Sequence, residues 1–104
     1  MATISSQTPL TTVREIVPSG VGKMVRDLIA CNYSGSAVIA KIYIVPSFGA
    51  SSTITDHLLW IVEVAANSTS RLDLRGYGIN ISSEHRIEAE AASNSAITLT
   101  VLGN

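Results

Sequence analysis

A glycine-rich segment followed by lysine, Gly20-Val21-Gly22-Lys23, is the first feature of this sequence that could bind a ligand. Phosphate-binding loops carry an earlier glycine five positions before the glycine that precedes lysine. They also place Ser or Thr directly after the lysine and open a helix whose N-terminus faces the phosphate. Here those two positions hold Val17 and Met24, and the segment leads into a predicted strand. It is therefore interpreted as a turn that begins a strand, and no nucleotide cofactor is expected.

Two glutamates at alternate positions, Glu88 and Glu90, share a predicted strand face with Arg86. Paired carboxylates act as general acid and base when their surroundings keep one of the two protonated. Side chains two positions apart on a strand are separated by about 7 Å. A strand face that is open to water desolvates neither carboxylate. We therefore expect this face to be a solvated outer surface or a polar contact surface.

The histidines and the cysteine are too few and too far apart for a metal or nucleophile site. A structural zinc ion takes four ligands that come as closely spaced pairs of Cys and His, whereas this sequence offers only His57, His85 and Cys31. No Gly-x-Ser-x-Gly segment marks a serine nucleophile. Cys31 has no neighbouring base, so it is expected to be a buried apolar residue. The sequence thus predicts no catalytic residue, cofactor or metal, and a protein that is not an enzyme.

Aromatic side chains can form a platform on which sugar rings stack, and the chain holds one Trp and three Tyr. Trp60, Tyr43, Tyr33 and Tyr77 fall on different predicted strands or turns, so the sequence does not gather them on one surface. Trp60 alternates with apolar residues, and its face is expected to lie at the centre of the core. A carbohydrate-binding module is kept as an alternative function.

Short apolar runs, separated by clusters of Asn, Ser, Gly and Pro, organise the chain that positions these residues. The runs alternate with a period near two, which is typical of a strand with one buried face. The breaks have the composition of turns. The sequence therefore predicts an all-β fold, a two-sheet antiparallel β-sandwich that is jelly-roll-like and has seven or eight strands. The expected strands cover residues 11–17, 23–32, 37–45, 58–64, a short segment around Leu72 and Leu74, 79–83, 85–91 and 96–102.

The alternation also predicts which side chains face the core. In the strand of residues 85–91 the isoleucine and alanines are expected inward and the charged residues outward, and in the strand of residues 96–102 Ile97, Leu99 and Val101 are expected inward. The strand of residues 23–32 has apolar residues on both faces, which indicates a central or doubly covered strand. Its predicted faces are Val25, Asp27, Ile29 and Cys31 on one side and Met24, Arg26, Leu28 and Ala30 on the other.

Length and charge limit the organisation and the partners. A chain of 104 residues suffices for one domain with one core. Residues 1–9 are small and polar and close with Pro9, so a flexible N-terminal arm is expected there, with residues 10–104 as a single β-sandwich domain. A formal net charge of −1 gives no basic surface for nucleic acid. No apolar run approaches the about 20 residues of a membrane span, so no membrane partner is expected.

Five segments, most of them rich in turn residues, follow one another in a characteristic order between about residue 16 and residue 102. The segments that carry it are Val17-Pro18-Ser19-Gly20, residues 26–37 (RDLIACNYSGSA), Ala65-Ala66-Asn67-Ser68-Thr69, Ile87-Glu88-Ala89 and Asn94-Ser95-Ala96. This order resembles small virion proteins of tailed bacteriophages, in which a proline–glycine turn precedes a strand that ends in Cys-Asn. The motifs are structural turn elements, and they include no catalytic signature.

The resemblance implies a β-sandwich or jelly roll that is a structural virion protein without enzymatic activity. The leading hypothesis is a capsid decoration (cement) protein that binds across capsomer seams and contacts the major capsid protein or another virion protein. A neck, tail or adaptor component of the same kind of particle is the alternative. The expected location is the virion, after synthesis in the bacterial cytoplasm, since no signal peptide is evident. The apolar content of 46% favours a homo-oligomer, a dimer or trimer.

The contact residues expected for such a role lie in the N-terminal arm and in the longest predicted connection. A polar terminus that becomes ordered on binding covers much surface for its length, and the connection holds the only phenylalanine. The expected partner-binding residues are Thr3, Ile4, Ser5, Ser6, Gln7, Thr8, Pro9, Phe48, Ser51, Ser52 and Thr53.

Overall fold

Nine β-strands account for most of the residues that the computed structural model describes, namely 2–7, 14–18, 23–46, 57–74, 76, 79–81, 85–93 and 96–103. No helix in these ranges is long and apolar enough to cross a membrane. The elements of the described residues are all strands, which confirms the all-β prediction. The strands are β1 (Ala2–Gln7), β2 (Arg14–Val17), β3 (Lys23–Asn32), β4 (Val38–Pro46), β5 (Leu58–Val64), β6 (Ser68–Asp73), β7 (Ile79–Ile81), β8 (His85–Ala91) and β9 (Ile97–Gly103).

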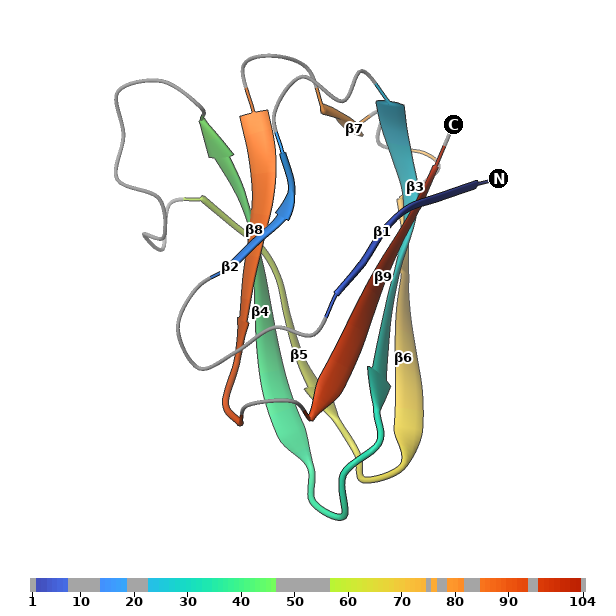
Figure 1. The fold of residues 1–104 in the computed structure, drawn as a ribbon, viewed down its shortest axis with the longest axis vertical. Coiled ribbons are helices and arrows are strands. Elements are labelled where there is room, and N and C mark those ends of the chain that lie inside the picture. The colour runs from blue at the N-terminus through green and yellow to red at the C-terminus, as the bar shows by residue number, and fades with distance from the viewer. Residues whose placement is uncertain are drawn as a thin grey trace.

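The strands form two antiparallel sheets that face each other as the layers of a sandwich (Figure 1). Sheet A has the order β1-β9-β3-β6, with the short β7 paired to β3, and sheet B has the order β2-β8-β4-β5. The N- and C-terminal ends of the chain lie close together at one edge of sheet A, where β1 runs beside β9 (Figure 1).

The strand pairs are nested as they are in a jelly roll. The chain pairs β4 with β5, β3 with β6, β2 with β8 and β1 with β9, so its two halves run antiparallel from the central hairpin outward. All of these partners except the central pair are far apart in sequence. Successive pairs along the nested hairpin alternate between the two sheets, as in a jelly roll. The predicted two-sheet, jelly-roll-like sandwich is confirmed.

The core lies between the sheets and consists of aliphatic side chains from both. The residues predicted inward on β8 and β9 are buried, including Ile87, Ile97, Leu99 and Val101. Trp60 differs from its prediction, because it is only partly buried and packs against the core from the side. The reason is its position on β5, an edge strand of sheet B, where one flank of each side chain has no neighbouring strand.

A register shift in β3 changes the faces that strict alternation predicts. Val25 pairs with Gly103 on β9 and Asp27 pairs with Leu102, the next residue on β9. Strand β3 therefore holds one extra residue, Arg26, at this point. Such a bulge moves the following residues to the other face. Val25 and Leu28 are both fully buried as a result, although the sequence placed them on opposite faces.

Ala2–Gln7 form a strand, whereas the sequence predicted a flexible arm over residues 1–9. Backbone groups of Ala2–Gln7 follow β9 in antiparallel register from Gly103 to Leu99, with one irregularity between Thr3 and Ser5. The described part of the segment is therefore an edge strand of sheet A. Small polar residues misled the prediction because an edge strand needs only one partner and tolerates a polar outer row.

Candidate functional site

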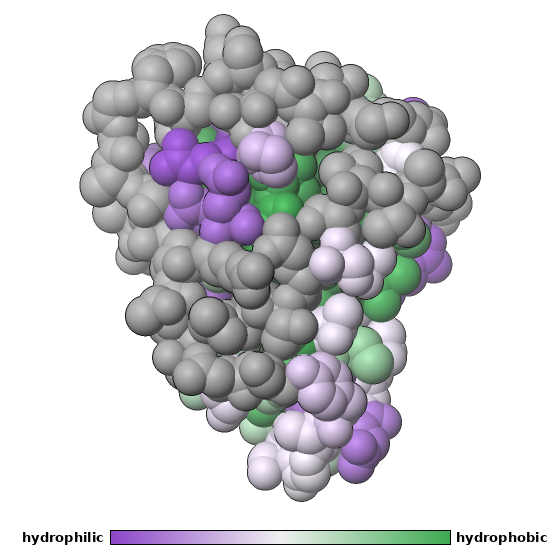
Figure 2. Space-filling view, in the orientation of Figure 1, coloured by the Kyte–Doolittle hydropathy of each residue, from purple (hydrophilic) through white to green (hydrophobic). Residues whose placement is uncertain are grey.

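The outer face of sheet B carries a row of charged and phenolic side chains across the adjacent strands β2, β8 and β4. Glu15 on β2 is the register partner of Glu88 on β8, which is in turn the partner of Tyr43 on β4. One step along the strands, Lys41 is the partner of Glu90. Hydrophilic residues gather over the β2 and β8 region in the space-filling view (Figure 2).

Arg86 holds Glu88 in this row. The Arg86 Nε donates to Glu88 Oε2 at 2.5 Å, and Glu15 Oε2 lies 3.9 Å from the same nitrogen. Glu88 is only 6% exposed, and its Oε1 is buried without a hydrogen-bond partner. The prediction of a solvated face is therefore wrong for Glu88. Its strand β8 lies between β2 and β4, and side chains on both neighbours shield it, whereas the sequence pattern treats each strand separately.

Tyr43 and Glu90 form a second polar pair on the same face. The Tyr43 hydroxyl donates to Glu90 Oε1 at 2.5 Å. Burial, the hydrogen bond and the negative charge of Glu90, in that order, raise the pKa of Tyr43 from 10.0 to about 12. Tyr43 therefore remains a hydrogen-bond donor throughout the physiological pH range, and it fixes the direction of the Glu90 carboxylate.

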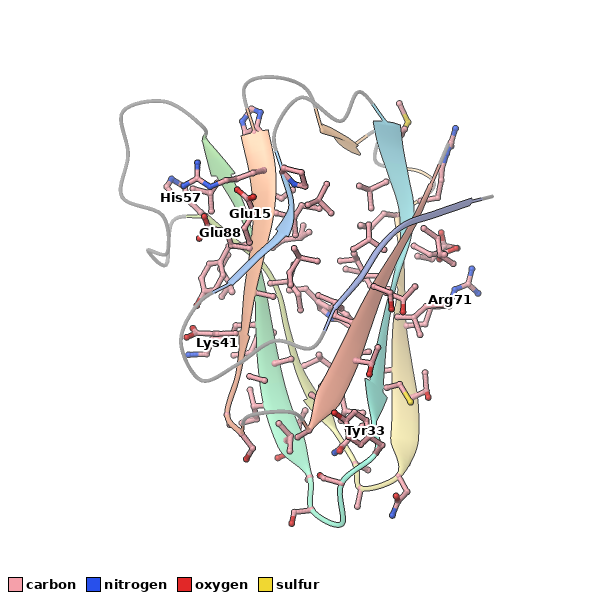
Figure 3. The ribbon with its side chains drawn as sticks, viewed as in Figure 1. Glu15, Tyr33, Lys41, His57, Arg71 and Glu88 are labelled. Atoms are coloured by element: carbon pink, nitrogen blue, oxygen red, sulfur yellow. The ribbon has the colours of Figure 1, made fainter. Side chains whose placement is uncertain are left out.

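A shallow pocket of about 400 Å³ adjoins this pair, lined by Ile39, Lys41, Glu90, Ala91 and Ala92. The backbone holds its rim, because the Ala92 N–H donates to the Ile39 carbonyl at 2.9 Å. The short side chains of the two alanines leave the space open. Lys41 points outward from this side of the molecule, opposite to Arg71 on sheet A (Figure 3).

Two exposed isoleucines extend the surface from the pocket to the sheet edge. Ile39 is 41% exposed and Ile61 is 54% exposed. Ile61 is the register partner of Lys41, and Ile39 that of Glu63, so the two isoleucines are diagonal neighbours. We call Ile39, Lys41, Ile61, Glu63 and Glu90 the sheet B patch. An apolar centre with charges of both signs around it is typical of a surface that contacts another protein.

The histidines and the cysteine lie apart. His57 and His85 precede or begin separate strands, β5 and β8, and Cys31 lies on β3 in the other sheet. Within the described ranges, no three His, Cys, Asp or Glu side chains lie close enough to hold a metal ion. Cys31 is exposed, so the prediction of a buried cysteine is wrong. The bulge in β3 is the cause, since it turns Cys31 toward the outer face. Residues 20–22 of the glycine-rich segment are outside the described ranges.

The aromatic residues are also dispersed. Tyr33 is 53% exposed in the turn between β3 and β4, Tyr43 is buried on sheet B, and Trp60 packs against the core. Tyr77 is outside the described residues. The three described aromatic rings belong to three different surroundings, and no observation among them favours sugar binding.

The predicted contact residues fall into two groups. Thr3, Ile4, Ser5, Ser6 and Gln7 lie in β1, where the exposed Ser6 hydroxyl is 3.2 Å from the Thr100 hydroxyl. The second group lies outside the residues that the structure describes: Thr8, Pro9, Phe48, Ser51, Ser52 and Thr53. The sheet B patch is thus a surface that the sequence reasoning did not single out.

Sequence reasoning also missed an ion pair between a buried aspartate and an exposed arginine on the outer face of sheet A. Asp27 is 1% exposed, and both of its carboxylate oxygens accept hydrogen bonds from Arg71, at 2.9 Å from Nε and 3.0 Å from Nη2. The two residues are 44 positions apart. The only signal in the sequence was an aspartate within an apolar strand, which indicates a buried charge with a partner but not which one.

Comparisons of the chain with models of protein families, with curated proteins and with solved structures found no match. The fold and the sheet B patch therefore rest on the sequence and its structure alone.

Proposed function

We propose that this protein is a structural virion component of a tailed bacteriophage, and that it decorates the capsid by docking the sheet B patch onto the major capsid protein or another virion protein. The observation that carries the docking role is the exposure of Ile39 and Ile61 side by side on the outer face. A small domain gains nothing in its own stability from two isoleucines in water, whereas a partner surface that covers them gains hydrophobic free energy.

The particle assignment rests on the resemblance of the turn segments to phage virion proteins. Two of those segments, residues 26–37 and 65–69, contribute to the fold in the structure. Asn32, in the Cys-Asn pair that ends β3, is buried and donates to the carbonyls of Ser36 at 2.8 Å and Val64 at 2.9 Å. Asn67, in the turn before β6, has a φ of 53° that asparagine tolerates better than most residues. The resemblance therefore concerns residues that build the sandwich, and jelly-roll sandwiches are common in viral capsids.

Mass action explains how such docking would strengthen a shell. A protein that binds only the assembled state stabilises it by RT ln(1 + [L]/Kd) at each site. Across a symmetric shell, the gain is repeated at every equivalent seam, so a modest patch is sufficient. The charges of both signs in the patch, Lys41, Glu63 and Glu90, orient the contact and exclude surfaces with the wrong charge pattern.

Binding to particles of the phage that encodes the chain tests the proposal. Ile39→Lys inserts a charge at the patch centre and should weaken binding to purified particles at least tenfold. Tyr33→Lys is the matched control, because Tyr33 is 53% exposed and lies in the turn between β3 and β4, away from the patch. Circular dichroism establishes that both variants are folded. Equal binding by the two variants, or no binding by the unaltered chain, overturns the docking surface.

Heads and tails separated before the binding assay distinguish the two virion roles. Binding to heads supports decoration of the capsid. Binding to tails or necks alone leaves the patch in place and moves the protein to the alternative role of a tail, neck or adaptor component.

A further inference from the structure

The four outer strands of the two sheets differ in how their free edges are protected. Natural proteins protect edges with short strands, charges, bulges or proline, because an open row of backbone groups pairs with other chains. Three edges show such devices. β2 has four residues with a register shift, β1 is largely polar and also shifted, and β6 (STSRLD) carries hydroxyl and charged residues.

The fourth edge strand, β5, is different. Its seven residues (LLWIVEV) include six apolar side chains, one charge and no proline. Ile61 is 54% exposed, and Trp60 and Val62 are only partly buried although they face the core. From Trp60 to Val64 the strand follows β4 without a register shift, so its free edge is regular over this length. An edge of this kind is a template for another strand.

We propose that β5 pairs antiparallel with β5 of a second copy of this chain, around a twofold axis at Val62. This register joins the two copies of sheet B into one continuous sheet. Ile61 then lies opposite Glu63 of the second copy, and Trp60 opposite Val64. The inner face of the joined strands is apolar, so the second copy covers the flanks of Trp60 and Val62 that are exposed to water in the single chain.

The charges of the patch favour this register. Among the described residues, neither Lys41 nor Glu63 has an ion-pair partner. Lys41 is the register partner of Ile61. In the joined sheet Ile61 therefore has Lys41 of its own chain on one side and Glu63 of the second copy on the other. The long lysine side chain can reach across one residue. The register also keeps the two Glu63 carboxylates from lying opposite each other, where they would repel.

The inference goes beyond the proposed function, since it concerns the isolated chain and does not depend on a particle. Sedimentation velocity of the purified full chain over a range of concentrations tests it. The unaltered chain should form a dimer, and Ile61→Glu, which sets two carboxylates opposite each other at each end of the contact, should raise the dimer dissociation constant at least tenfold. The matched control is Ile39→Glu, the same change on the same face but one strand inward, which should leave the constant within about twofold.

Three results overturn the inference. A chain that is monomeric at all concentrations does so, as does a dimer that Ile61→Glu leaves unchanged. A dimer that Ile61→Glu and Ile39→Glu dissociate equally is a contact between the faces of the sheets and not between their edges. Failure in any of these ways leaves the docking proposal standing, because particle binding is measured separately.

Cross-linking tests the register independently of the glutamate variants. In a Cys31→Ser background, Val62→Cys places two thiols directly opposite each other, within the separation that a disulfide spans. Glu63→Cys is the matched control, since its thiols would be diagonal across the axis, about 7–8 Å apart at the Cα atoms and beyond disulfide reach. Oxidation should yield a covalent dimer for Val62→Cys alone. A dimer formed by Glu63→Cys and not by Val62→Cys refutes the register.

Discussion

Tyr43 on β4 donates its phenolic hydrogen to Glu90 on β8, with 2.5 Å between Oη and Oε1. The pair links two neighbouring strands of sheet B on the same outer face as the exposed isoleucines, and Glu90 lines the pocket together with Lys41 and the alanines. A hydrogen bond to an ionised group is stronger than one between neutral groups. It therefore anchors the carboxylate of the patch in one position.

Tyr43→Phe should lower the free energy of unfolding by about 1–2 kcal/mol at neutral pH, because it removes one hydrogen bond to a charged group and leaves the ring in place. Urea unfolding followed by circular dichroism measures this difference. A loss below about 0.3 kcal/mol would show that water replaces the phenol at no cost.

The same pair predicts a dependence on alkaline pH. Since burial, the hydrogen bond to Glu90 and its charge raise the pKa of Tyr43 to about 12, the folded protein holds the phenolic proton more tightly than the unfolded chain does. The stability from this proton is complete below the unfolded pKa of 10.0 and is lost as the pH rises through about 12. The advantage of the unaltered chain over Tyr43→Phe should shrink in this window, by up to about 1.4 kcal/mol per pH unit. A difference that stays constant contradicts the assignment.

Arg71→Ala should destabilise the fold by about 1–3 kcal/mol, because it leaves the Asp27 carboxylate without its bidentate partner. The side chain of Asp27 is 2% exposed whereas that of Arg71 is 51% exposed, so the cost arises mainly from the buried partner. A double-mutant cycle with Asp27→Asn isolates the coupling between the two residues. Additive losses from the two substitutions would mean that the pair contributes no interaction of its own.

Asn32→Asp should be more destabilising than Asn32→Ala. The amide nitrogen of Asn32 donates to the carbonyls of Ser36 and Val64, while its oxygen accepts from the Ser34 N–H and hydroxyl. Aspartate would place an oxygen against two carbonyls in a buried site, whereas alanine only leaves them unpaired. We expect losses of about 3–5 and 2–3 kcal/mol from chemical unfolding. The reverse order would exclude this network as the organiser of the turn.

Deletion of residues 1–7 should destabilise the sandwich by several kcal/mol, because it removes β1 from sheet A and exposes β9 as a new edge. Light scattering should reveal aggregation of the shortened chain. Ser6→Ala removes only the contact with Thr100 and should change stability by less than about 0.5 kcal/mol. A shortened chain as stable as the full one would return these residues to the role of an arm.

Sequence periodicity predicted the layers well because it depends on a local property, the alternation of side chains along each strand. It failed at Val25 and Cys31, where a bulge fixed by the pairing of β3 with β9 shifts the phase. Position within a sheet was equally out of reach. Trp60 lies at an edge and Glu88 between two strands, and the pattern of a single strand contains neither fact.

The patch shows the same limit. Ile39 and Ile61 each look like ordinary members of an apolar run. They form one surface only because the register between β4 and β5 makes them diagonal neighbours on the outer face. The ion pair of Asp27 with Arg71 depends on the pairing of β3 with β6, which are separated by a long stretch of chain. Partners that are distant in sequence are set by topology, and no local pattern encodes them.

If the proposal holds, a tailed phage encodes this chain, and counting the chain in purified particles of that phage tests the proposal most directly. Quantitative mass spectrometry of separated heads and tails gives the copy number in each. The account predicts many copies in the head fraction, in fixed proportion to the major capsid protein. Absence of the chain from both fractions would contradict its role as a virion component.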